Sequence, residues 1–171
     1  MNETEQLEQL RFAISRYDHY YESINSKGNL YLALNSILIG GIAASYPFID
    51  QKLHLNARYN LVLIAIVLQC ALSLITTIAA INPFTKSGLQ SGQISLLYYG
   101  QVSQLEFSFF SRRFRKRTLN LHVTDMLRQM HTLARGLNRK LQLLKWAGLF
   151  LSGALLLLIS ATLMLILKNI Q

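Results

Sequence analysis

Charged residues are scarce in this chain: they make up 15% of its 171 residues, whereas a soluble domain typically carries about 25%. They are missing altogether from three apolar windows, at residues 28–49, 59–85 and 146–167. Each window exceeds the roughly 20 residues that a helix needs to cross about 30 Å of hydrocarbon. The sequence therefore predicts an all-α membrane protein with three transmembrane helices, at about 29–49, 59–82 and 146–167.

Cysteine and the usual catalytic motifs are also lacking. The single Cys70 excludes a disulfide within the chain, and it lies in the second window as a small residue facing lipid or another helix. The sequence contains no P-loop, GxGxxG or GxSxG, and no carboxylates pair at catalytic spacing. We therefore expect no catalytic residue and no cofactor. We also expect no metal site, because the four histidines share no ligand spacing: His19, His54, His122 and His131.

No ionisable residue lies inside a predicted span, which argues against a proton relay or an ion-coupled carrier. Hydrogen bonds between helices are the preferred interpretation of the polar residues there, with a pore lining as the alternative: Asn35, Gln69, Ser73, Thr76, Thr77, Ser152, Ser160 and Thr162. Gly40 and Ala44, like Gly41 and Ser45, are small residues four apart, which permits close helix approach in lipid. Three spans are too few to enclose a wide aqueous path, so a homo-oligomer is expected.

Lysine and arginine predict the orientation, because basic residues concentrate on the cytoplasmic side of a membrane. Fourteen of the 17 precede the first span or lie between spans two and three. We therefore expect a cytoplasmic N-terminus and an external C-terminus. The predicted segments outside the spans are a cytoplasmic N-terminal helix (1–28), an outer loop (50–58), a cytoplasmic helical region (83–145) and an outer tail (168–171).

Apolar spacing predicts the helices outside the membrane. A seam at steps of three and four indicates a helix from residue 3, continuing into the first span and packing on a partner: Leu7, Leu10, Ile14, Tyr17, Tyr21 and Ile24. Pro47 and Asp50 are expected to end the first span, and Asn82 and Pro83 the second. Between spans two and three we expect a short apolar piece at 94–100 that lies in the membrane interface or packs on the bundle.

A capping-box pattern at 103–106, with Ser103 as the cap, predicts a helix from about residue 104. A further long helix is predicted over 121–167, without an interrupting proline. One of its faces is apolar: Met126, Met130, Leu133, Leu137, Leu141 and Leu144. The basic residues are expected largely off that face: Arg128, Arg135, Arg139, Lys140 and Lys145.

The run SRRFRKR at 111–117 places five basic residues in the middle of the chain. It is consistent with a topology signal that contacts anionic lipid, or with a site that holds a phosphate through charge-assisted hydrogen bonds. Nucleic acid polymer is disfavoured as a partner, since the part outside the spans is small. The candidate ligand-binding residues are these cations and a tyrosine pair that can stack on a base or anchor at the membrane interface: Tyr98, Tyr99, Arg112, Arg113, Arg115, Lys116 and Arg117.

Three stretches resemble the transmembrane effectors of Pycsar systems. The first is RYDHYYESINSKGNLYLALNSILIGGI, in which a helix passes a polar-Lys-small junction into a span. The second is INPF followed by ISLLYYGQVSQLEF, with an aromatic pair before glycine. The third is TDMLRQMHTLARGLNRKLQLLKWAG, which leads into the last span. Together they cover most of the chain in the family's order.

The resemblance implies a bacterial antiphage effector in the inner membrane. It would be activated by cyclic CMP or cyclic UMP from a partner cyclase, and would impair the membrane to cause abortive infection. The alternatives are a non-enzymatic scaffold that binds lipid and a partner helix, a small oligomeric channel, or an effector of a related nucleotide-signal defence system.

Overall fold

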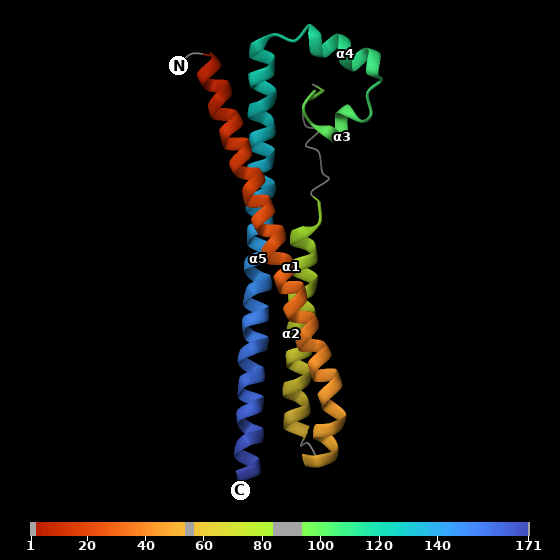
Figure 1. Cartoon of the computed structure of the whole chain (residues 1–171), viewed down its shortest axis with the longest axis vertical. Coiled ribbons are helices and arrows are strands. Elements are labelled where there is room, and N and C mark those ends of the chain that lie inside the picture. The colour runs from red at the N-terminus through yellow and green to blue at the C-terminus, as the bar shows by residue number, and fades with distance from the viewer. Residues whose placement is uncertain (1–2, 54–56, 84–93, 171) are drawn as a thin grey trace. The chain divides into compact units, whose positions relative to one another are not determined.

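A computed structural model describes residues 3–53, 57–83 and 94–170, and these residues form helices without any strand. The helices are α1 (Glu3–Leu53), α2 (Ala57–Ile81), α3 (Tyr99–Val102), α4 (Phe107–Arg115) and α5 (Leu119–Ile170) (Figure 1). Helices α1, α2 and α5 each contain a stretch long and apolar enough to cross a membrane. The predicted fold class, all-α with three such helices, is confirmed.

The chain divides into two compact units. Unit 1 comprises Met1–Glu22 and Pro83–Arg139, and therefore holds α3, α4 and the N-terminal parts of α1 and α5. Unit 2 comprises Ser23–Asn82 and Lys140–Gln171, and holds α2 with the remaining parts of α1 and α5. The expected continuity of the N-terminal helix into the first span is confirmed, because α1 has no break between Glu3 and Leu53.

The core of unit 1 is the packing of α1 on α5. Leu10 is buried against Val123 and Met126, and three half-buried side chains pack around them: Leu7, Ile14 and Met130. The partner that the apolar seam predicts is therefore the chain's own α5. Farther along the same pair, the Tyr21 hydroxyl donates a hydrogen bond of 2.9 Å to the Leu133 carbonyl.

Unit 2 contains an apolar cluster of Ile66, Cys70 and Ala154. Cys70 is fully buried there, so it faces neighbouring helices. Of the polar residues predicted to join helices, two do so. The Asn35 amide donates to the Ser73 hydroxyl at 2.9 Å, which in turn donates to the Ala147 carbonyl at 3.0 Å, and this chain of bonds links α1, α2 and α5.

The prediction of interhelix hydrogen bonds is wrong for five other polar residues of the spans. A hydroxyl within a helix can bond the carbonyl of the preceding turn, which satisfies it without a partner helix. The structure shows this arrangement for Thr76, Thr77, Ser152, Ser160 and Thr162.

Two predicted helix boundaries are wrong. Helix α1 passes through Pro47 and Asp50 and continues to Leu53, because one proline near a helix end removes only one bond from the backbone ladder. Ser103 ends α3 and does not cap α4, which begins at Phe107 with Glu106 in an extended conformation. The Glu106 carboxylate accepts a hydrogen bond from the Ser108 hydroxyl instead of closing a capping box. Helix α2 ends at Ile81, directly before the Asn82–Pro83 pair that was predicted to stop it.

The buried face of α5 also differs from the prediction at one turn. Met126, Leu137 and Leu144 are buried as expected. Leu141, however, is 47% exposed, whereas Lys140 is only 6% exposed. Position 140 lies three residues after Leu137 and four before Leu144, so it shares their buried face, and the Lys140 ammonium is satisfied there by carbonyl groups at the end of α2, as described below.

Candidate functional site

Unit 1 contains a cavity of about 480 Å³, a size within the usual range of small-molecule sites. It lies among α4, the turn that follows it, the first turns of α5 and the segment at 94–96. Five of its lining residues are cationic, one is acidic and three are aliphatic. The lining residues are Ile94, Leu96, Arg112, Arg113, Lys116, Arg117, Leu121, Thr124, Asp125 and Arg128.

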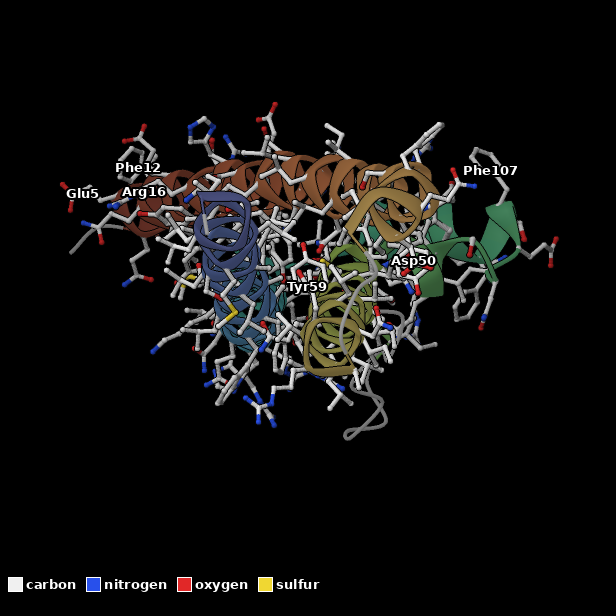
Figure 2. All side chains as sticks on the ribbon, turned by 90° about the horizontal axis from the view of Figure 1, so that it is seen from below. Glu5, Phe12, Arg16, Asp50, Tyr59 and Phe107 are labelled. Carbon is white, nitrogen blue, oxygen red and sulfur yellow. The ribbon has the colours of Figure 1, made fainter. Side chains whose placement is uncertain are left out.

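Helix α4 delivers its basic side chains to this cavity because of its periodicity. Residues three and four apart share a face of a helix, so Arg112 and Arg113 of α4 lie on the same side as Lys116, the residue that follows its last turn. The Arg113 guanidinium also lies 4.8 Å from the centre of the Phe109 ring, which favours a stacked cation–π contact. The opposite side of α4 is aromatic: Phe107 is 80% exposed and points outward (Figure 2).

Asp125 is the acidic centre of the cavity. Its Oδ2 atom accepts a hydrogen bond of 2.6 Å from Nη2 of Arg117, and a second of 3.1 Å from the Leu96 backbone N–H. Both side chains of the ion pair are largely shielded from solvent, with relative exposures of 11% for Arg117 and 8% for Asp125. Asp125 therefore ties the segment around Leu96 and the Arg117 guanidinium to α5.

A second contact fixes the same segment on α5. The Ser95 hydroxyl accepts a hydrogen bond of 3.1 Å from the Gln129 side-chain amide. It also accepts bonds from the backbone N–H groups of Leu97 and Tyr98, and the Ser95 N–H donates to Gln101. These bonds satisfy the backbone of a non-helical stretch, so that Leu96 can be buried and Ile94 can line the cavity.

The Arg117 guanidinium retains an unused donor. Its Nη2 atom also donates to the Leu121 carbonyl at 3.1 Å, but its buried Nη1 atom has no hydrogen-bond partner among the described residues. A buried donor without an acceptor costs roughly 1–3 kcal/mol, and more when the group is charged. With four further cations around it, the cavity is suited to an anion that has several acceptor oxygens, such as a phosphate group.

The structure brings together four of the seven predicted ligand residues: Arg112, Arg113, Lys116 and Arg117 line the cavity. Arg115, Tyr98 and Tyr99 do not. The two tyrosine rings lie 5.1 Å apart at their centres, and Tyr99 is 70% exposed. The ring of Tyr98 covers Gly100, where an added Cβ atom would lie 2.7 Å from the ring, so any larger residue there requires the ring to shift.

Sequence reasoning missed the contribution of α5 to this cavity. The α5 residues of the cavity are Leu121, Thr124, Asp125 and Arg128. They follow one another at helical spacing, so this face is predictable once the helix is assigned. Asp125 also carries a signal of its own, because it is the last acidic residue of the chain and Glu106 is the only other one after Asp50. A single carboxylate in so basic a stretch is a candidate for an internal ion pair.

Lys140 is a second missed residue, in unit 2. Its Nζ atom donates to the carbonyl oxygens of Ala80 at 2.6 Å, Ile81 at 3.0 Å and Asn82 at 2.9 Å. The last carbonyls of a helix have no partner within the helix, and a cation there also opposes the helix dipole. Lys140 thus caps the C-terminal end of α2. Burial lowers the pKa of its ammonium below the ordinary value of 10.5.

The comparisons with known proteins give one match. The model of the Pycsar effector protein domain, PycTM, matches residues 9–167, which is most of the chain. Searches of curated proteins and of solved structures found no match. Among the described residues no group of His, Cys, Asp and Glu is arranged to hold a metal ion.

Proposed function

This chain belongs to the Pycsar effector family, a family of antiphage defence, and on that premise we propose that it is a membrane effector activated by cyclic CMP or cyclic UMP. A partner cyclase makes the nucleotide upon infection. The activated protein then impairs the bacterial inner membrane and causes abortive infection. The role is that of a non-enzymatic effector, which is general in this family.

The basic cavity of unit 1 is the observation that carries this proposal. A cyclic mononucleotide combines one phosphodiester charge with a flat base. Arg112, Arg113 and Lys116 supply donors for the phosphate, and the aliphatic side chains of Ile94 and Leu96 supply an apolar surface for the base. Three further residues remain predicted contacts of the nucleotide, although they do not line the cavity: Tyr98, Tyr99 and Arg115.

The response to the ligand is carried by α1 and α5. Each of these helices contributes to both units without a break. A ligand that binds one packing of unit 1 better than another shifts the balance between them by its difference in affinity. The proposed topology has the N-terminus and residues 83–145 in the cytoplasm and the C-terminus outside, with the active form a homo-oligomer.

Calorimetry on detergent-purified full-length protein measures the binding of cyclic CMP and cyclic UMP. Cyclic AMP serves as the control. We expect selective binding of one pyrimidine nucleotide and weaker binding by the double variant Arg112→Gln/Arg113→Gln. The matched control is Arg11→Gln/Arg135→Gln, which removes the same charge from exposed positions outside the cavity. If the unmodified protein binds neither pyrimidine nucleotide, the proposal is refuted.

A cellular assay tests the outcome of activation. Co-expression with a pyrimidine nucleotide cyclase should admit a membrane-impermeant dye into the cells, whereas an inactive cyclase should leave them intact. The double variant should lose this effect and the control variant should keep it. Dye entry that is independent of cyclase activity contradicts a nucleotide-gated effector and favours a constitutive channel.

The aromatic side of α4 supports a second candidate function, binding to the surface of anionic membranes. Phe107 and Phe114 are exposed, and Arg115, next to Phe114 in the chain, is exposed as well; such a combination inserts rings among headgroups while the cation binds their phosphates. Flotation of detergent-solubilised protein with vesicles of anionic and neutral lipid tests it. Under this alternative, Phe107→Ser reduces vesicle binding and cyclic nucleotides have no effect.

A further inference from the structure

The charge balance of the basic cavity raises a question of selectivity. Five cations attract a phosphate more strongly the more charge it carries. A linear nucleoside monophosphate carries a charge of about −1.5 to −2 near neutral pH, as other phosphomonoesters do, whereas a cyclic phosphodiester carries one. A cavity with cations alone would therefore favour the linear nucleotide, which every cell contains, over the cyclic one.

Asp125 opposes this preference from within the cavity. It is the one acidic residue among the lining residues, and its carboxylate is held in place by the Arg117 guanidinium and by the Leu96 N–H. Because that carboxylate is largely shielded from solvent, its field is screened less than that of a surface charge. It repels a second ligand charge as strongly as the first.

We propose that Asp125 is a specificity-determining residue that shifts the preference of the cavity away from a phosphomonoester dianion and toward a singly charged phosphodiester. The inference rests on the proposed function, since it concerns the same site. Asp125 also acts as an internal competitor for Arg117: the resting ion pair occupies Nη2, while the buried Nη1 atom has no partner among the described residues. A ligand phosphate that binds Nη1 therefore shares the Arg117 guanidinium with Asp125.

The size of the effect follows from Coulomb's law. At an effective dielectric constant near 20, a unit charge about 6 Å from the phosphate changes binding roughly hundredfold per unit of ligand charge. Solvent in the open cavity reduces this to about tenfold or more. Loss of the carboxylate should therefore tighten binding of cyclic nucleotides at least about tenfold, and of linear monophosphates by a further factor of similar size.

The experiment compares affinities of the full-length protein in detergent for cyclic UMP, cyclic CMP, UMP and CMP. The variant Asp125→Asn retains an oxygen that can accept from the Leu96 N–H but has no charge. Asp18→Asn is the matched control, since Asp18 is an exposed acidic residue of unit 1 outside this cavity. We expect Asp125→Asn to bind the linear nucleotides relatively better, and Asp18→Asn to keep the original preference.

A second variant guards against misfolding of Asp125→Asn, which leaves Arg117 without its ion-pair partner. Thr124→Asp adds a negative charge to the cavity from the neighbouring position on α5. It should shift selectivity the other way, toward the cyclic nucleotides, while all affinities fall. Helical content by circular dichroism and elution volume confirm that each variant is folded.

The outcomes separate this inference from the proposed function. If the unmodified protein binds a cyclic pyrimidine nucleotide but neither variant changes the preference for cyclic over linear ligands, the role of Asp125 is wrong and the effector proposal stands. A shift in opposite directions for the two variants supports the inference. If the unmodified protein binds none of the four nucleotides, both proposals fail together.

Discussion

Replacing Lys140 by methionine tests the cap on α2 directly. Methionine keeps a long, flexible chain at this position but removes the ammonium and its three hydrogen bonds to Ala80, Ile81 and Asn82. Because Ala80 is fully buried, water cannot readily replace the hydrogen bond to its carbonyl group. The substitution should therefore loosen the end of α2 and its attachment to α5.

The magnitude can be estimated from these contacts. Hydrogen bonds to charged groups contribute about 1.5–3 kcal/mol each, and a buried carbonyl group left without a donor costs about 1–3 kcal/mol. The substitution also relieves the desolvation of the ammonium, the effect that lowers its pKa. We expect a net loss of roughly 3 kcal/mol, which corresponds to a fall in Tm of about 6–12 °C for a chain of this size.

The assay is thermal unfolding of purified protein in one detergent, followed by circular dichroism. Lys145→Met is the matched control, because Lys145 is an exposed lysine of the same helix. Its substitution should change stability by no more than about 0.5 kcal/mol. Equal Tm values for the two variants would show that the three hydrogen bonds do not stabilise unit 2, and the reasoning would be refuted.

Three further predictions follow from other contacts. Burial lowers the pKa of Lys140, so the unfolded chain binds more protons than the folded chain between that pKa and 10.5. The free energy of unfolding should therefore rise with pH in this window, as thermal unfolding at a series of pH values would show, and Lys140→Met should abolish the rise. Tyr21→Phe removes a hydrogen bond to α5 and should cost about 1 kcal/mol in thermal unfolding, whereas Tyr20→Phe, at an exposed hydroxyl, should cost nothing measurable. An added Cβ atom at Gly40 or Gly41 meets no neighbouring atom within 4 Å, so Gly40→Leu and Gly41→Leu should leave the fold intact but reduce the oligomers trapped by cross-linking; unchanged cross-linking would contradict a small-residue contact between copies.

Uncharged apolar windows and apolar residues at helical spacing made the long helices predictable. An apolar window without charge has few stable structures other than a spanning helix, so α2 and the apolar parts of α1 and α5 follow from composition. The seam through Leu10 and Ile14 likewise required a helical partner. The boundaries at Leu53 and Phe107 were missed because a proline or a capping pattern only biases a helix end, and neighbouring hydrogen bonds decide it.

The candidate site was predictable in part. The run at 111–117 singled out Arg112, Arg113, Lys116 and Arg117, because a dense local charge is visible in the sequence. The sequence also separated these cations from the apolar windows and made the family resemblance visible, and the family match confirms that resemblance.

Only the tertiary structure decided which distant residues meet these cations. Asp125 joins Arg117 because the chain turns between α4 and α5, and Lys140 meets the end of α2 because two helices far apart in sequence are adjacent. Residue type and spacing are local properties of the sequence, so they determine the helices, the apolar windows and the local charge. A buried ion pair or a helix cap depends on distances between segments, and those are set by packing.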